Sequence, residues 1–272
     1  MTIIINDYEL VKKLGQGSYG EVWKGVNIHK KKEVAVKIEQ RNSKNTLKYE
    51  IIILRYLKQL NCVPKVKYYG QISKYNYIIM ELFGDTIINY YNKQNTKDGE
   101  IKWLGLKMLE CIEEVHTYGI IHRDIKPDNF LLTTDNKDLK IIDFGLAKQY
   151  MDKNGNHKCN KKHSNITGTL RYISKYVHEG NSPSRRDDII SIIYILIYLF
   201  NSFLPWQGLI YDDFDTKINA IYKMKCKLID KKMDKNSIYI PVKIVDMLEY
   251  AENLKYDDIP KYDYLNLLLK TL

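Results

Sequence analysis

The sequence predicts an α+β fold in which a small antiparallel β-sheet with one main helix precedes a larger, mainly helical part. From residue 8 to residue 38, apolar residues alternate on both sides of a glycine-rich turn, as in antiparallel strands. Residues 101–118 carry apolar side chains at helical spacing, and residues 189–200 are almost all apolar, as in a buried helix. We expect one domain over residues 8–272, with a smaller lobe at 8–84 and a larger lobe at 85–272.

The glycine-rich turn has the pattern Gly-x-Gly-x-x-Gly at residues 15–20. Glycine lets backbone N–H groups approach a phosphate without a Cβ in the way, so the turn is a candidate phosphate-binding loop. The dinucleotide-binding fingerprint has the same letters, but it needs a helix directly afterwards and an acid about twenty residues on. Glu39 lies near that spacing, whereas Val22 and Trp23 continue a strand pattern. A hairpin is therefore the favoured interpretation.

Lys37 lies in a third strand among apolar neighbours, where an ammonium group is costly to bury without a partner. A helix is predicted at Thr46–Gln59. Its apolar stripe consists of Leu47, Ile51, Leu54 and Leu57. Glu50 lies beside that stripe, so we predict that Glu50 rather than Glu39 forms an ion pair with Lys37. The alternatives are a lysine at a strand edge and an exposed helix glutamate.

Two further strands are predicted at Val66–Gln71 and Tyr77–Leu82. The second runs into the connector Glu81–Gly84, whose backbone groups can hydrogen-bond the edge of a planar base. Met80, just before the connector, would shape such a pocket. The helix predicted at 101–118 then leads to a dense group of polar residues.

These polar residues, His122–Asn129, lie between two apolar pairs, which suggests a loop held at both ends by buried segments. Pro127 lacks a backbone N–H and favours an extended preceding residue, so we expect no helix here. The carboxylate of Asp124, the ammonium group of Lys126 and the amide oxygen of Asn129 suit a reaction that moves a highly charged group. On composition alone, a solvated turn fits as well.

Asp143 follows a strand predicted at Leu139–Ile142 and precedes Phe144 and Gly145. An aspartate at a strand end beside glycine can bind Mg²⁺ with little backbone crowding. Asn129 and Asp143 would supply oxygen ligands only. Two protein ligands suffice, because magnesium keeps several waters and takes its other ligands from phosphates.

Composition bounds the class of protein. Of the 272 residues, 44% are hydrophobic, which is enough for a real core. The net charge of +10 favours anionic partners, although lysine is abundant along the whole chain rather than in one patch. The four cysteines form no metal-binding pattern, so free thiols are expected. The longest apolar run, Ile189–Phe200, spans ~18 Å as a helix against ~30 Å of bilayer hydrocarbon, so we expect a soluble, intracellular protein.

Several motifs, in this order, resemble those of the eukaryotic protein kinases. They are Gly15–Val22, Lys37, Glu50, His122–Asn129 and Asp143–Gly145. Lys126, two residues after Asp124, resembles the serine/threonine branch. Nearly the whole chain is more specifically similar to the casein kinase 1 family, through residues 122–131, 141–148, 167–172, 184–188 and 204–209. As in that family, no Ala-Pro-Glu closes the segment before the buried helix; Ile173-Ser174-Lys175 stands there instead.

This resemblance implies a bilobal protein-kinase fold and a serine/threonine kinase that uses ATP and Mg²⁺. Asp124 would orient the substrate hydroxyl group and take its proton, and Lys126 would stabilise the moving phosphoryl group. Asn129 and Asp143 would bind Mg²⁺, and Asp188 would brace the polar loop from the buried helix. The residues implied to bind ATP are Leu14, Gly15, Gln16, Gly17, Ser18, Tyr19, Gly20, Glu21, Val22, Ala35, Lys37, Glu50, Met80, Glu81 and Leu82.

The family binds acidic or phosphorylated peptides through an arginine, matched here by Arg171, and a lysine further on. The second position falls near Ala220, with Lys217 and Lys223 close by, so the sequence leaves a preference for phosphorylated peptides open. We expect protein substrates, a monomer, and no membrane or nucleic-acid partner. One alternative is a pseudokinase that acts as a scaffold, which the complete set of catalytic residues disfavours. The other is a nucleic-acid-binding module, suggested by charge alone.

Overall fold

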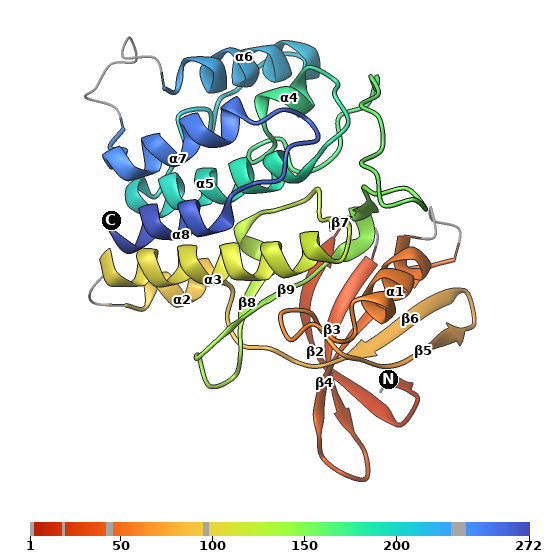
Figure 1. Ribbon diagram of the computed structural model, residues 1–272. Helices are drawn as coiled ribbons and strands as arrows, with labels where there is room; N and C mark the ends of the chain where they lie inside the picture. Colours follow the sequence, from red (N-terminus) through yellow and green to blue (C-terminus); the bar gives the residue numbers. More distant parts are fainter. Residues whose placement is uncertain (1–2, 18–19, 42–45, 95–97, 230–237) are drawn as a thin grey trace. The chain divides into compact units, whose positions relative to one another are not determined.

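A computed structural model describes most of the chain (Figure 1). The described residues are 3–17, 20–41, 46–94, 98–229 and 238–272. The chain forms two compact units. The first unit comprises residues 1–85 and 131–146, and the second comprises residues 86–130 and 147–272. The predicted α+β fold class is confirmed, because a small antiparallel sheet occurs in the first unit and helices dominate the second.

The first unit is built on a six-stranded antiparallel sheet with the strand order β1-β2-β3-β4-β6-β5. Its strands are β1 (Ile4–Ile5), β2 (Tyr8–Gly17), β3 (Gly20–Asn27), β4 (Glu33–Gln40), β5 (Val66–Ile72) and β6 (Tyr75–Met80). Alternation in the sequence places one set of side chains in a common core. Among them are Tyr8, Val34, Val36 and Ile79. Because β6 ends at Met80, Glu81 and Leu82 lie just beyond the strand rather than inside it.

The helix of the first unit, α1 (Thr46–Tyr56), ends before the predicted Gln59. Beyond it, the Lys65 ammonium group donates to the carbonyl oxygens of Lys58 and Leu60, each at 2.6 Å. These carbonyls therefore have partners without a further helical turn. The predicted apolar stripe is confirmed, since all four of its side chains are buried: Leu47, Ile51, Leu54 and Leu57.

Residues 131–146 complete the first unit. A two-stranded sheet formed by β8 (Phe130–Leu132) and β9 (Leu139–Ile141) carries the chain to Asp143. The short 3₁₀ helix η2 (Phe144–Leu146) then packs against α1. The arrangement brings Asp143 to the helix that carries Glu50.

The second unit is mainly helical (Figure 1). Its helices are α2 (Ile87–Asn92), α3 (Asp98–Thr117), α4 (Lys175–His178), α5 (Arg185–Asn201), α6 (Phe214–Lys227), α7 (Val242–Asn253) and α8 (Tyr262–Lys270). Helix α5 packs against α3 and α7, and α8 packs against the same two helices. Within the described part of the chain, no helix has the length and apolarity needed to cross a membrane.

Helix α5 is the predicted apolar helix, and it is buried from Arg185 through Ile197. It begins with a capping box in which Asp187 Oδ2 accepts a hydrogen bond from the Ser184 backbone N–H at 2.7 Å. Such a cap satisfies backbone donors of the first turn that have no partner within the helix. This explains Asp187 as a helix cap, whereas Asp188 has a separate set of partners.

Candidate functional site

The polar stretch His122–Asn129 follows β7 (Ile120–Ile121) and ends in a 3₁₀ helix, η1 (Pro127–Asn129). Lys126 is extended, with φ −156° and ψ 161°, as expected before a proline. The expectation of no helix is wrong for the three residues that follow. The restricted φ of proline suits the first position of a helical turn, and the Asn129 N–H closes that turn on the Lys126 carbonyl oxygen at 3.0 Å.

Asp124 is the centre of a hydrogen-bonded group in the second unit. Its Oδ2 lies 2.6 Å from Lys126 Nζ, and its Oδ1 accepts a hydrogen bond from Thr169 Oγ1 at 2.7 Å. Asn129 Nδ2 donates to the backbone carbonyl oxygen of Asp124 at 2.8 Å. The predicted catalytic residues Asp124 and Lys126 therefore contact each other, and the predicted metal ligand Asn129 is tied to the same loop.

The approach of Thr169 to Asp124 depends on Gly168. Gly168 has φ +99°, and a Cβ built on it would lie 2.5 Å from the Arg123 carbonyl oxygen. A glycine is therefore required for the segment around Thr169 to approach the loop so closely. Arg123 itself has φ +69°, a conformation that costs free energy in a non-glycine residue and is concentrated at functional sites.

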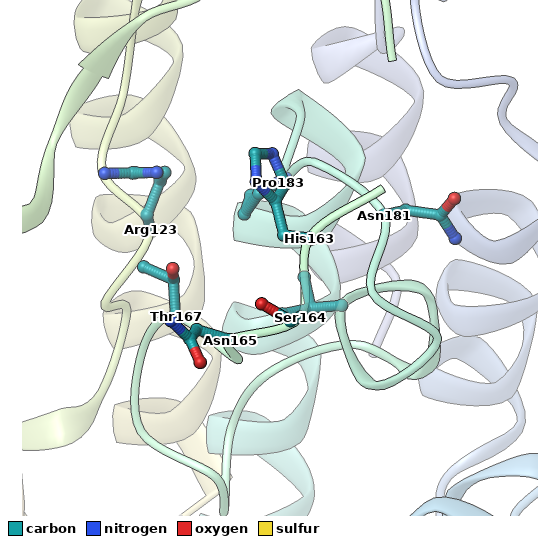
Figure 2. A pocket seen from close by; sticks show the side chains of 8 residues that line it. Arg123, His163, Ser164, Asn165, Thr167, Asn181 and Pro183 are labelled. Carbon is teal, nitrogen blue, oxygen red and sulfur yellow. The ribbon is translucent and has the colours of Figure 1, made fainter. Parts of the chain in front are cut away.

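A small polar cavity lies beside this contact in the second unit (Figure 2). Its volume is about 180 Å³. The residues that line it are Arg123, His163, Ser164, Asn165, Thr167, Val177, Asn181 and Pro183. The Arg123 guanidinium group places a positive charge at this cavity. Burial lowers the pKa of the nearby Lys148, and the cations Arg123, Lys158 and Lys161 add to that effect.

Asp188 holds the polar loop from helix α5. Its Oδ2 accepts the His122 backbone N–H at 2.7 Å, and its Oδ1 accepts the Arg123 backbone N–H at 2.9 Å. The His116 ring in α3 lies between Asp188 and Tyr262, with Nε2 3.0 Å from Asp188 Oδ2 and Nδ1 2.5 Å from Tyr262 Oη. The brace implied for Asp188 thus extends through His116 to the first residue of α8.

The charges in this network are set by burial and hydrogen bonding. Burial acts to raise the pKa of Asp188, but the hydrogen bond with His116 and the other interactions with His116 and His122 together outweigh burial and lower that pKa below its usual value. Burial lowers the pKa of His116, so its ring is neutral at pH 7. A neutral ring that donates from Nε2 to Asp188 accepts the Tyr262 hydroxyl at Nδ1. Neither His116 nor Tyr262 was identified from the sequence.

Replacing Asp188 with asparagine is expected to lower stability by about 3 kcal/mol, because two backbone donors lose a charged acceptor. The loop that carries Asp124 should then be held less well, so kcat should fall by roughly 10–100-fold. Denaturant unfolding and steady-state kinetics measure the two effects. Tyr262→Phe is the milder comparison, with an expected loss of about 1 kcal/mol. Wild-type stability and kcat in the Asp188→Asn variant would contradict the assigned brace.

A second group of predicted site residues lies in the first unit. Lys37 Nζ is 2.7 Å from Glu50 Oε2 and 2.9 Å from Asp143 Oδ1. The Glu50 side chain is 2% exposed, whereas that of Asp143 is 41% exposed. Glu50 is therefore the buried partner of Lys37, and Asp143 is the member of the group that remains accessible. Asp143 also has φ +65°, again a conformation that non-glycine residues rarely adopt.

Electrostatics in this group follow from its burial. Burial alone lowers the pKa of Lys37, but the carboxylates of Glu50 and Asp143 outweigh burial and raise the pKa above its usual value. Burial raises the pKa of Glu50, and Lys37 only partly offsets that rise. Lys37 is therefore fully charged at neutral pH, and it carries the positive charge that a phosphate ligand needs.

Glu39, the alternative partner of Lys37, has another role. Its Oε1 accepts a hydrogen bond from Thr46 Oγ1 at 2.7 Å, and its Oε2 accepts the Leu47 backbone N–H at 2.8 Å. Glu39 thus satisfies a donor in the first turn of α1, where a carboxylate is also favoured by the helix dipole.

The glycines of the β2–β3 hairpin differ in how much space a side chain would have at each position. A Cβ at Gly20 would lie 2.1 Å from the Ile38 carbonyl oxygen, so close packing of β3 on β4 requires that glycine. A Cβ at Gly15 or Gly17 would meet nothing within 4 Å among the described residues. Packing among the described residues therefore does not explain these two glycines. Ser18 and Tyr19 lie outside the described residues.

The other predicted nucleotide-binding residues lie on or beside the same sheet. In register, Val22 is opposite Lys37, and Ala35 is opposite Met80. The side chains of Gln16 and Glu21 both bind Lys13 Nζ, at 2.8 and 2.7 Å. Leu14 is exposed on β2, and Leu82 follows Glu81 in the connector after β6. The Glu81 carboxylate accepts the Lys65 backbone N–H at 3.1 Å.

The predicted magnesium ligands fit that ion by the chemistry of their donor atoms. Asp143 offers a carboxylate, and Asn129 offers an amide oxygen, which are the hard ligands that magnesium prefers. The hydrogen bond from Asn129 Nδ2 to Asp124 orients the amide, so Oδ1 is directed away from that contact. Each of the two units therefore holds one candidate ligand.

Comparison with known families agrees with this pattern of residues. The sequence matches the family model of the protein kinase domain over residues 8–257. The match includes the Lys37 group, the Asp124 group and most of the helical second unit. It therefore covers nearly the whole chain. The chain thus belongs to the protein kinase family, whose members transfer a phosphoryl group from ATP to protein substrates.

Proposed function

We propose that the chain is a serine/threonine kinase in which Asp124 orients the substrate hydroxyl group and accepts its proton. The proposal rests on the contacts of both Asp124 carboxylate oxygens. Lys126 forms an ion pair with one oxygen, and Thr169 donates a hydrogen bond to the other. An aspartate carboxylate is a weak base. Orientation therefore contributes more than basicity, which suffices for a loose phosphoryl-transfer transition state.

Lys126 is proposed to stabilise the phosphoryl group during transfer. Its ammonium group contacts Asp124 and also lies 3.4 Å from Thr169 Oγ1. A cation held beside the acceptor carboxylate can neutralise developing negative charge at the point of transfer. The position of this lysine, two residues after the aspartate, supports the serine/threonine rather than the tyrosine specificity.

We further propose that the Lys37 group and the Asp124 group act on the same ATP molecule. Lys37, held by Glu50, would bind the α- and β-phosphates, and the backbone over Gly15 and Gly17 would approach them. Asn129 and Asp143 would hold Mg²⁺, which neutralises phosphate charge when it is bound. The connector at Glu81 and Leu82 would hydrogen-bond the adenine through its backbone.

Acidic or phosphorylated peptides are the proposed substrates. Arg171 is exposed in the segment that follows Thr169, and Lys217 and Lys223 are exposed on α6. The net charge of +10 also favours acidic partners. These features support a preference for negative charge near the target hydroxyl group. The basic side chains would attract an acidic peptide as it approaches and would stabilise the bound complex.

Phosphorylation of casein with Mg-ATP, followed by phosphoamino-acid analysis, tests the proposal. We expect phosphoserine and phosphothreonine, with no phosphotyrosine. A matched pair of peptides, one with aspartates around the serine and one with asparagines, tests the substrate preference. We expect the acidic peptide to have the higher kcat/KM, with an advantage that shrinks as salt is added. Phosphotyrosine as the main product would refute the serine/threonine assignment.

A further inference from the structure

Helix α6 contains a lysine that the proposed mechanism does not use. Lys225 is only 1% exposed, although lysine is rarely buried without an acidic partner. Its Nζ donates to the carbonyl oxygens of Leu170 at 2.9 Å and Ile173 at 2.5 Å. His178 Nε2 lies 3.2 Å away as a third contact. Within the described residues, no carboxylate forms an ion pair with Lys225.

The surroundings of Lys225 match the needs of an ammonium group. Such a group has three donors and no acceptor, and it meets three acceptor atoms here when His178 is neutral. Burial, followed by the charge of Lys225, lowers the pKa of His178 to about 3, so that ring is neutral. The rings of Tyr194 and Trp206 lie 5.3 and 5.1 Å from Nζ and add cation–π attraction. Burial nevertheless lowers the pKa of Lys225 well below its usual value.

The carbonyl groups that Lys225 binds belong to the segment directly after Thr169. Every carbonyl oxygen from residue 170 to residue 173 is held by a side chain. Lys225 binds the first and the last, Trp206 Nε1 donates to that of Arg171 at 2.8 Å, and Ser191 Oγ donates to that of Tyr172 at 2.8 Å. With its backbone fixed in this way, the segment presents Thr169 to Asp124 and leaves the Arg171 side chain exposed.

We propose that Lys225 is a positioning residue for phosphoryl transfer. By holding the carbonyl oxygens of Leu170 and Ile173, it keeps Thr169 on the Asp124 carboxylate and turns Arg171 towards the substrate peptide. Thr169 and Arg171 flank Leu170, whose carbonyl oxygen accepts a hydrogen bond from Lys225. The positions of both residues therefore depend on this one contact. This inference rests on the proposed kinase function, in which Asp124 orients the substrate hydroxyl group.

Lys225→Met is the test variant, because methionine has an unbranched side chain only one atom shorter than that of lysine and carries no hydrogen-bond donor. Lys227→Met is the matched control, since Lys227 is an exposed lysine on the same helix. For Lys225→Met we expect kcat/KM for an acidic peptide to fall by roughly 10–100-fold, with a lower kcat and a higher peptide KM. The KM for ATP should stay within about twofold of wild type, because the hydrogen-bond partners of Lys225 among the described residues, Leu170, Ile173 and His178, are not among the residues proposed to bind ATP. Lys227→Met should leave all these constants within about twofold.

The outcomes separate this inference from the proposed function. A wild-type chain without kinase activity would remove the proposed function itself. An active wild type with an unchanged peptide kcat/KM in Lys225→Met would overturn the positioning role alone. Equal losses in peptide and ATP kinetics, with a lower melting temperature, would also overturn it, because they indicate a general effect on folding.

A second variant is available for the case in which Lys225→Met does not fold. Trp206→Phe keeps an aromatic ring near Lys225 but removes the donor to the Arg171 carbonyl oxygen. We expect a severalfold loss of peptide kcat/KM with an unchanged KM for ATP. If Lys225→Met does not fold and Trp206→Phe has the peptide kinetics of the wild type, the proposal is overturned.

Discussion

Replacing Asp124 with asparagine is expected to lower kcat for casein by roughly 10²–10⁴-fold. Asparagine keeps the size of the side chain and can accept the Thr169 hydroxyl, but it cannot accept a proton from the substrate. The KM for ATP should stay within about twofold, because Asp124 is proposed to act on the hydroxyl group rather than on the nucleotide. Steady-state kinetics at saturating Mg-ATP measure the effect.

The control for this variant is Asp212→Asn, which removes an exposed carboxylate from the same unit. It should leave kcat within about twofold, since surface charges contribute little. Equal labelling of casein by wild type and Asp124→Asn would mean that the Asp124 carboxylate does not take part in transfer, and the assigned chemistry would be wrong.

Replacing Lys37 with methionine is expected to abolish nucleotide-dependent activity and to lower stability by about 3–5 kcal/mol at pH 7.5. The variant leaves the Glu50 carboxylate, which is 2% exposed, without its ammonium partner. Burial already raises the pKa of Glu50, and the loss of Lys37 raises it further.

The pH dependence of this loss has a definite sign. Below the usual glutamate pKa of about 4.3, Glu50 is protonated in both the folded and the unfolded state, so its burial carries no charge penalty. As the pH rises towards the raised pKa of the folded state, the unfolded state ionises first and becomes favoured. The stability lost in Lys37→Met should therefore be smaller at pH 5 than at pH 7.5.

Denaturant unfolding of Lys37→Met at both pH values measures this effect. The double variant Lys37→Met/Glu50→Gln removes the buried charge, so it should recover most of the stability at pH 7.5 without recovering activity. A loss that is the same at pH 5 and pH 7.5, or a double variant no more stable than Lys37→Met, would show that Glu50 is not an unpaired charge in the single variant.

Local sequence patterns were sufficient to predict much of the first unit. The alternation around the glycines indicates a hairpin because strand side chains alternate between two faces. Helical periodicity places Glu50 beside the buried stripe of α1, which favours it over Glu39 as the partner of Lys37. No sequence pattern predicts the hydrogen bonds of Glu39 to Thr46 and Leu47 at the start of α1, because they depend on the path of the chain between β4 and the helix.

Contacts between distant segments account for what the sequence did not predict. Lys225 is buried with Ile221 of α6 and with Leu228, the residue that follows the helix, which is an unusual position for a lysine. Its partners, however, are backbone carbonyl groups more than fifty residues earlier, and no side-chain pattern identifies them. His116 and Tyr262 are similar, since a buried polar residue on an apolar helix face looks like ordinary packing until its neighbours are known.

We propose that side chains from both units act on one ATP molecule and its metal. A crystal structure of the chain with Mg²⁺ and a non-hydrolysable ATP analogue would test this. We expect one magnesium ion bound by both Asn129 Oδ1 and the Asp143 carboxylate, with Lys37 at the α- and β-phosphates and Asp124 facing the γ-phosphate. A nucleotide bound without Lys37, or a metal that contacts neither Asn129 nor Asp143, would contradict it.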